Sequence, residues 1–278
     1  MLGQRILTAI VLLALLLPAL FAAQAWPFAA LTLLMIAAAG WEWARLNQTT
    51  GVAAWASGAV LALACAAAWA GGWTGSAPAA AWWGASGLWL LGGGLALCGG
   101  PARWPLLPRG LRWGIGLLAL WAAWLALAHA RVVGLNFILS VFCLVWMADI
   151  AAYVGGRSFG RRKLAPTISP GKTWEGAWSG VAGVLLLALG WTLVEQRLDD
   201  PGASLFSTLI ALYGLAGSAL ALTALAGFSV VGDLFESLVK RAAGAKDSSA
   251  LLPGHGGVLD RVDALLPAFP LALALTRL

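Results

Sequence analysis

Apolar residues fill the chain in nine long runs, and short polar stretches separate these runs. The runs cover residues 6–23, 26–46, 52–71, 79–98, 111–130, 134–155, 176–195, 206–227 and 258–277. Each is close to the about 20 residues that a helix needs to cross a hydrocarbon core of roughly 30 Å. None alternates as barrel strands do, and backbone groups in lipid must be satisfied internally, which favours helices. The pattern predicts an all-α, polytopic integral membrane helical bundle with about nine transmembrane helices.

Two of the nine runs contain residues that disfavour a regular helix. The fourth run includes Gly92, Gly93 and Gly94. The ninth run begins in a charged motif and contains Pro267 and Pro270. Because glycine and proline are the poorest helix formers, we expect these two spans to depart most from the simple pattern.

Composition and charge agree with a membrane bundle. Hydrophobic residues make up 61% of the 278 residues and charged residues only 10%, whereas a soluble domain carries about 25% charged residues. With the amino terminus in the cytoplasm, 14 of the 17 basic residues fall on the cytoplasmic face, as the positive-inside rule requires. Topology therefore explains the net charge of +6, and we expect no nucleic-acid partner.

The acidic residues lie almost entirely in the second half of the chain. Glu42 is the only one before position 149, and the other ten follow. An ionisable group inside a membrane is costly, and by default it marks a functional site. We therefore expect residues 1–133 to supply five N-terminal transmembrane helices. Residues 134–278 should form a C-terminal catalytic transmembrane region of four spans, with a polar site facing the cytoplasm.

A first polar stretch begins at Asp149, inside the sixth run. Further on, Ser169 followed by Pro170 resembles a helix N-cap and first helical position, which predicts a helix start with free N–H groups suited to phosphate. Lys172 and Thr173 resemble the end of a Walker A motif, but no strand or opening glycine precedes them. Two simpler interpretations stay open: Asp149 could form an interhelical hydrogen bond or ion pair, and the basic loop could contact anionic lipid headgroups.

A second polar stretch is richer in charge. Its first members keep helical spacing and form one stripe: Asp233, Glu236, Ser237, Lys240 and Arg241. A turn with Pro253 and three glycines follows, and then Asp260 and Asp263 enter the last run. Separated carboxylates suit Mg²⁺, which leaves positions free for phosphate oxygens. A lone His255 is more often structural and a lone charge run is more often solvated, but charges, glycines and membrane entry coincide here, as phosphoryl-type transfer requires.

This stretch resembles the phosphatidate cytidylyltransferase (CDP-diacylglycerol synthase) family. The family signature reads Ser-x-apolar-Lys-Arg, then four residues, Lys-Asp, and later His-Gly-Gly-x-x-Asp-Arg-x-Asp. Eleven positions meet it in order and spacing: Ser237, Lys240, Arg241, Lys246, Asp247, His255, Gly256, Gly257, Asp260, Arg261 and Asp263. The block from Asp149 to Gly176 is also similar to the family, so that the resemblance covers roughly Trp146 to Asp263.

The resemblance implies an enzyme that transfers CMP from CTP to phosphatidic acid. The implied catalytic residues are Asp233, Lys240, Arg241, Asp260 and Asp263. The implied substrate-binding residues are Asp149, Lys172, Thr173, Ser237, Lys246, Asp247, His255, Gly256, Gly257 and Arg261. Asp233 and Asp260 would hold Mg²⁺ or Mn²⁺, with a monovalent cation such as K⁺ as a further candidate. The resemblance also implies a homodimer among membrane lipids, in a bacterial inner membrane with the active site facing the cytoplasm.

Two other functions compete with this interpretation. A membrane lipid or polyprenol kinase that uses CTP would attack a different phosphorus, and the complete signature argues against it. An ion-coupled transporter would explain buried Asp149, Asp233 and Asp260 as a pathway. It would not explain a cluster of Lys, Arg, Gly and Asp on one face, and the halves show no inverted repeat.

Overall fold

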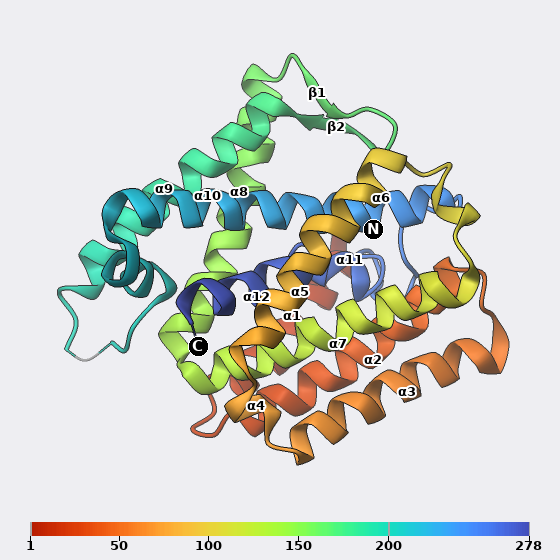
Figure 1. The fold of residues 1–278 in the computed structure, drawn as a ribbon, viewed down its shortest axis with the longest axis horizontal. Coiled ribbons are helices and arrows are strands. Elements are labelled where there is room, and N and C mark those ends of the chain that lie inside the picture. The colour runs from red at the N-terminus through yellow and green to blue at the C-terminus, as the bar shows by residue number, and fades with distance from the viewer. Residues whose placement is uncertain (1, 200, 278) are drawn as a thin grey trace.

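The computed structural model describes residues 2–199 and 201–277. Its elements are α1 (Leu2–Phe21), α2 (Trp26–Leu46), α3 (Gly51–Ala70), α4 (Trp73–Ser76), α5 (Ala79–Leu88), the π-helical turn η1 (Trp89–Gly93), α6 (Gly94–Gly99), the 3-10 turn η2 (Trp104–Leu106), α7 (Arg109–Val133), α8 (Leu135–Phe159), β1 (Lys163–Ala165), β2 (Ser169–Thr173), α9 (Trp174–Glu195), α10 (Leu205–Ala242), α11 (Leu259–Val262) and α12 (Leu265–Thr276). Helices form nearly all of the molecule, and one short hairpin is the exception (Figure 1). The predicted all-α membrane bundle is confirmed.

Seven helices in the described part of the chain are long and apolar enough to cross a membrane: α1, α2, α3, α7, α8, α9 and α10. The predicted fourth span is helical from residue 79 to residue 99, but it consists of α5, η1 and α6 in succession. Its π-helical turn includes Gly92 and Gly93, two of the glycines that disfavour a regular helix.

The predicted ninth span, residues 258–277, differs more. It separates into α11 and the 12-residue α12, and twelve residues rise only about 18 Å, well short of a hydrocarbon core. Apolar residues cover α12 on every side, and nearly all of them are buried against α5, α7, α8 and α10. A helix that is apolar all round belongs in a core, so α12 is an internal helix of the bundle.

Glycines allow α8 and α9 to pack closely. A Cβ atom at Gly176 would lie 2.7 Å from the carbonyl oxygen of Ala152, and one at Gly180 would lie 2.8 Å from that of Ala148. Small residues let helix backbones approach within a membrane. The two helices thereby form a rigid pair, and the β1–β2 hairpin connects them at one end (Figure 1).

The long helix α10 crosses the middle of the molecule (Figure 1). Gly214 breaks it with a backbone conformation of φ 66° and ψ −176°. Near the other end of α10, the ring of Phe235 stacks on Trp43 and meets Trp89 and Trp104 edge-on, with centroids 6.0, 5.3 and 5.4 Å away. Aromatic pairs at these distances attract each other, so residues of the first half fix the position of the charged stripe on α10.

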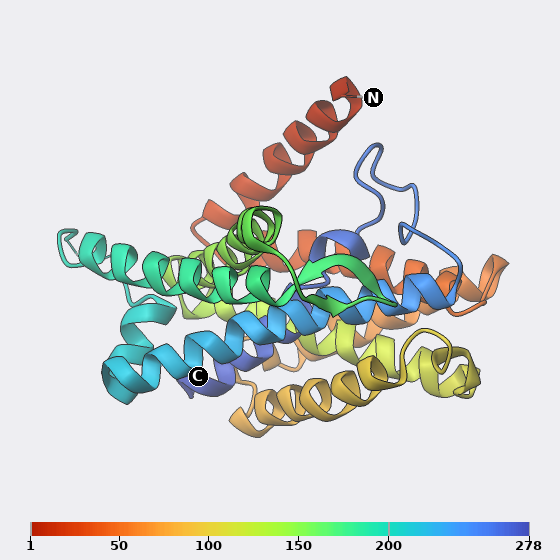
Figure 2. The same cartoon turned by 90° about the horizontal axis from the view of Figure 1, so that it is seen from above.

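Several contacts identify one end of the bundle, which we call the polar end. It comprises the last turns of α2, α8 and α10 and the first turns of α1, α7 and α9. Thr8 of α1 donates a hydrogen bond to Pro253 O at 2.9 Å, and Figure 2 shows the start of α1 beside the loop after α10. At the opposite end, Arg131 bonds to Leu20 O at 2.8 Å, and Arg277 lies over the ring of Tyr213.

Candidate active site

A short hairpin, rather than a helix start, presents the basic loop. Ser169 lies opposite Ala165 in the antiparallel β1–β2 pair. The predicted helix start at Ser169 and Pro170 is therefore wrong, and α9 begins at Trp174. An edge position of a two-stranded hairpin tolerates the missing N–H of proline. Thr173 caps α9 instead, because its hydroxyl accepts a hydrogen bond from the N–H of Gly176 at 3.1 Å.

Lys172 of β2 forms an ion pair with Asp233 of α10. Its Nζ lies 2.5 Å from Asp233 Oδ2, and the two side chains are 25% and 27% exposed. The hydroxyl of Ser237 donates to the other oxygen of Asp233 at 3.3 Å. Asp149 and Asp263 lie close enough to Asp233 to interact with it electrostatically. The structure thus brings together five predicted site residues, Asp149, Lys172, Asp233, Ser237 and Asp263, from α8, β2, α10 and the segment before α12.

A cavity of about 540 Å³ opens over this cluster. We call it the hairpin pocket; its polar lining consists of Asp149, Tyr153, Arg157, Ser169, Lys172, Thr173 and Asp233. The hairpin supplies one cation and two hydroxyl groups to this lining, α8 supplies a second cation, and one carboxylate comes from each of α8 and α10. Such a pocket suits an anionic group, above all with a cation bound beside it.

Lys240 connects α10 to the glycine turn. Its Nζ lies 2.6 Å from Asp260 Oδ1 and also pairs with Glu236, one turn earlier on α10. Asp260 Oδ2 accepts three more hydrogen bonds: from the N–H of Ser248 at 2.8 Å, from its hydroxyl at 2.7 Å, and from the N–H of Gly257 at 2.8 Å. Burial raises the pKa of Asp260, but these hydrogen bonds outweigh burial and hold the pKa well below its ordinary value.

The glycine turn has steric reasons for its glycines. Gly254 and Gly256 have φ values of +77° and +80°, which glycine adopts without strain. A Cβ atom at Gly256 would also lie 2.7 Å from Asp260 Oδ2, and one at Gly257 would collide with the carboxylate of Glu42. The glycines therefore let the backbone of this turn approach two carboxylates closely.

A second polar cavity, of about 480 Å³, lies on the other side of this turn. We call it the loop pocket; its polar lining includes Arg5, Lys246, Asp247, Ser249, His255, Gly256 and Arg261. The Nδ1 atom of His255 is buried and has no hydrogen-bond partner among the described residues. With three basic side chains and one acid, the loop pocket is the most cationic cavity described for this chain.

Arg241 lies outside both pockets. Its guanidinium donates to Ile168 O at 3.4 Å and to Ala245 O at 3.3 Å. Arg241 therefore ties the end of α10 to the hairpin and to the loop that follows. Its catalytic role stays a prediction.

The two predicted metal ligands have different partners. Asp233 pairs with Lys172, whereas both oxygens of Asp260 are already bonded. Along α10, Asp233 and Lys240 are two turns apart, about 10 Å, so a shared ion would require Asp260 to leave Lys240. No group of three His, Cys, Asp or Glu side chains able to hold a metal occurs in residues 2–199 and 201–277. Mg²⁺ needs only one or two carboxylates beside phosphate oxygens, and Asp233 already binds one cation, the ammonium of Lys172.

Sequence reasoning missed two residues of the site: Glu42 of α2 reaches the glycine turn, and Arg5 of α1 lines the loop pocket. It placed Glu236 in the charged stripe but gave no role to this buried acid, which pairs with Lys240. For Glu42 a signal existed, since it is the one acid in the first 148 residues and lies in an apolar run. Arg5 had no signal beyond its place among the topology-setting basic residues.

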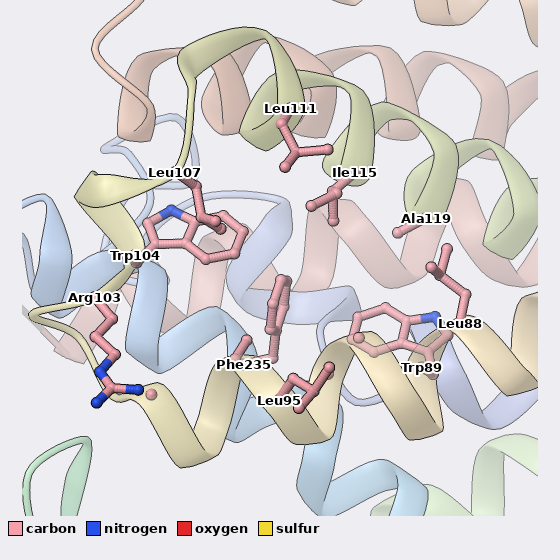
Figure 3. Close-up of a pocket in the computed structure, with 14 residues that line it drawn as sticks. Leu88, Trp89, Leu95, Arg103, Trp104, Leu107, Leu111, Ile115, Ala119 and Phe235 are labelled. Carbon is pink, nitrogen blue, oxygen red and sulfur yellow. The ribbon is translucent and has the colours of Figure 1, made fainter.

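An apolar pocket of about 340 Å³ adjoins the site (Figure 3). Trp89, Trp104 and Phe235 line it together with aliphatic side chains of α6 and α7, and Arg103 lies at its edge. Phe235 belongs to the same stretch of α10 as Asp233 and Glu236. With a single cation at the edge, this pocket does not suit a triphosphate, and it accommodates apolar groups.

Comparison with known proteins agrees with the architecture and the site. The chain belongs to the cytidylyltransferase family, whose model matches residues 3–278. It is similar to the phosphatidate cytidylyltransferase of Pseudomonas aeruginosa, with 40% identity over 282 aligned positions that cover 99% of this chain and 97% of the relative. A relative of the same name from Haemophilus influenzae is 46% identical over 142 positions, which cover 51% of this chain and 46% of the relative. Phosphatidate cytidylyltransferase 5, chloroplastic, of Arabidopsis thaliana is 36% identical over 189 positions, which cover 66% of this chain and 44% of the relative. The resemblance found in the signature is confirmed, and the chain is a nucleotidyltransferase.

Proposed function

We propose that this protein transfers CMP from CTP to phosphatidic acid and leaves CDP-diacylglycerol in the membrane. The observation that carries the proposal is the pair of polar pockets at one end of a membrane bundle, on either side of the Lys240–Asp260 ion pair. Family membership and relatives named phosphatidate cytidylyltransferase support it. A kinase or a transporter is not favoured by these similarities.

The reaction requires one substitution at phosphorus. A phosphate oxygen of phosphatidic acid attacks the α-phosphorus of CTP, and the bond from that phosphorus to the oxygen bridging to the β-phosphorus breaks. Pyrophosphate leaves with the bonding electrons. Because the attacking phosphate is already ionised, no strong general base is needed. The work of the protein is to position two anions and to offset their charge.

The two pockets suggest a division of the substrates. Lys246, His255 and Arg261 of the loop pocket would bind the triphosphate of CTP. Lys172 and Thr173 of the hairpin pocket would bind the lipid phosphate. Lys240, between Glu236 and Asp260, would stabilise charge where the two phosphates meet.

Mg²⁺ or Mn²⁺ would be held by Asp233, with Asp260 as the predicted second ligand and Asp263 close by. Such an ion would offset the negative charge of the phosphates during transfer. A monovalent cation such as K⁺ alongside is a further expectation from the family resemblance. The carboxylates of Asp149 and Asp233 in the lining of the hairpin pocket support a cation there.

We expect the polar end to face the cytoplasm of a bacterial cell, with the protein in the inner membrane and arranged as a homodimer. CTP is a cytoplasmic nucleotide, and the sorting of basic residues supports that orientation. Light scattering of the purified protein in detergent would report the oligomeric state.

The test of function uses two labelled forms of CTP with phosphatidic acid and Mg²⁺. Label in the α-phosphate should enter the lipid fraction, and label in the γ-phosphate should leave as pyrophosphate. A kinase would instead place the γ-phosphate label in the lipid and leave the α-phosphate label in CDP. If neither label enters lipid with protein that is folded and membrane-inserted, the proposed function is wrong.

A further inference from the structure

Glu42 is a buried carboxylate that the proposed reaction does not use. It lies near the end of α2 and is completely inaccessible to solvent. The nearest acidic residue along the chain is Asp149, more than a hundred positions away. None of the ion pairs described in this chain includes Glu42. An unpaired buried charge is very costly unless hydrogen bonds compensate it.

Four donors from a distant segment surround this carboxylate. Oε1 accepts from the hydroxyl of Ser249 at 2.6 Å and from the N–H of Val258 at 3.0 Å. Oε2 accepts from the N–H of Leu259 at 2.7 Å and from the hydroxyl of Ser248 at 3.2 Å. The Ser248 hydroxyl has one proton and is also bonded to Asp260 Oδ2 at 2.7 Å. Glu42 therefore has three donors of its own and shares the fourth with Asp260.

The same segment holds Asp260. The hydroxyl of Ser248 lies between the two acids, 3.2 Å from Glu42 Oε2 and 2.7 Å from Asp260 Oδ2. The N–H groups of Val258 and Leu259, directly before Asp260 in the chain, also point to Glu42. Glu42 thus holds both ends of the glycine turn, at residues 248–249 and 258–259. This turn lines the loop pocket and leads into Asp260, which pairs with Lys240.

We propose that Glu42 is a positioning residue that holds the nucleotide side of the active site in its reactive geometry. The proposal rests on the proposed function, since it assigns the glycine turn to CTP. Glu42 touches no substrate. It acts through Ser248 and the turn on Asp260, and it makes a helix of the first half part of the machinery.

The test begins with Glu42→Gln, which keeps the size of the side chain. The amide NH₂ would face one of the two backbone N–H groups, and a backbone N–H cannot turn round to accept as a hydroxyl can. We expect kcat/KM for CTP to fall about 10-fold or more, as when a buried donor loses its acceptor. The KM for phosphatidic acid should not change, because the hairpin pocket has no contact with Glu42.

Glu195→Gln is the matched control. Glu195 accepts hydrogen bonds from Ser204 N at 3.0 Å, Ser204 Oγ at 2.7 Å and Ser207 Oγ at 2.9 Å. It likewise holds a loop to a helix, but it lies at the other end of α9, about 30 Å along the helix from the hairpin. This variant should lose similar local contacts and keep normal kinetics for both substrates.

Hydrogen–deuterium exchange gives a readout independent of turnover. Glu42→Gln should speed exchange in the peptide spanning residues 248–259 and leave exchange in the hairpin unchanged. Glu195→Gln should leave exchange unchanged in both segments. Wild-type enzyme that makes no lipid product under the same conditions would refute the proposed function. Active wild type with an equally active, folded Glu42→Gln would refute the role of Glu42, as would equal losses for both substrates.

If Glu42→Gln does not accumulate in the membrane, the variant Ser248→Ala tests the proposal instead. This change removes the hydroxyl between Glu42 and Asp260 but leaves three donors on Glu42. It should lower kcat/KM for CTP selectively. Unchanged kinetics in Ser248→Ala would overturn the proposal.

Discussion

Lys172 forms an ion pair with Asp233 in the hairpin pocket, and Asp149 and Asp263 lie close to this pair. Removing it leaves Asp233, Asp149 and Asp263 without the ammonium that pairs with Asp233. We expect Lys172→Ala to lower kcat/KM by about 10²-fold, the effect of losing a well-placed electrostatic stabiliser. Lys163→Ala is the control, since Lys163 is an exposed hairpin lysine outside both pockets. Equal activities of the two variants would show that the hairpin only touches lipid headgroups.

Asp233 and Asp260 have different hydrogen-bond and ion-pair partners, so substituting each in turn can test whether both bind the same metal ion. Chelation should abolish turnover, and Mg²⁺ or Mn²⁺ should restore it. If both carboxylates bind one ion, Asp233→Asn and Asp260→Asn should each raise the Mn²⁺ concentration needed for half-maximal activity. Their double variant should be hardly worse than either single one, because residues that act as a unit are non-additive.

The outcome that contradicts a shared ion is equally definite. If Asp233→Asn and Asp263→Asn raise the Mn²⁺ requirement and Asp260→Asn does not, the ion is bound by Asp233 and Asp263 without Asp260. Asp260 would then serve to hold Lys240 and the glycine turn. Activity that survives exhaustive chelation would remove the metal from the mechanism.

Among elements, the α8–α9 pair depends on the absence of side chains. A methyl group at Gly180 would press on the carbonyl of Ala148, whereas Gly190 on the same helix has open space around it. Gly180→Ala should destabilise the protein by about 1–3 kcal/mol, as overpacking usually does. Gly190→Ala should be neutral or slightly stabilising because alanine is the better helix former. Thermal unfolding in detergent, followed by activity, checks both; equal midpoints would contradict the packing argument.

The helices were predictable because a bilayer leaves the backbone little choice, but their ends were not. Hydropathy ended the predicted eighth span at residue 227, yet α10 continues to Ala242 because its charges keep helical spacing. Ser169 and Pro170 suit a helix start and an edge strand equally well, and pairing with β1 decides between them. Local motifs identified most of the pocket residues. Glu42 could not be found in this way, since its partners lie more than 200 positions away.

For the whole molecule, the sorting of basic residues predicts which end faces the cytoplasm. Ala203 lies in the loop before α10 and Ala250 in the loop after it, and both are exposed. In a background without Cys65, Cys98 and Cys143, a cysteine at position 203 should react with an impermeant thiol reagent from outside the cell. A cysteine at position 250 should react only after permeabilisation. The reverse pattern would place both polar pockets on a face without CTP.

A division of the chain into an N-terminal part, 1–133, and a catalytic part, 134–278, stays a prediction. The contacts of Glu42 and Arg5 with the loop after α10 bear on it, because they connect the first part to the loop pocket. Expressing the second part alone would test it. We expect the isolated fragment to be inactive.

The break at Gly214 and the first charge at Asp233 delimit an uncharged segment of α10 whose length can be compared with the thickness of the bilayer. The 18 residues from 215 to 232 carry no charge, and they rise about 27 Å, close to the thickness of a hydrocarbon core. Asp233 then lies at the boundary of the hydrocarbon core, at the depth of the lipid phosphates. A water-soluble nucleotide and a membrane lipid can therefore meet there while each stays in its own phase. The activity of the enzyme should therefore depend on bilayer thickness. In vesicles of much longer acyl chains, this carboxylate would be drawn into hydrocarbon or the tilt of α10 would decrease. Turnover should then fall. The same rate across all chain lengths would show that the length of this segment does not matter for activity.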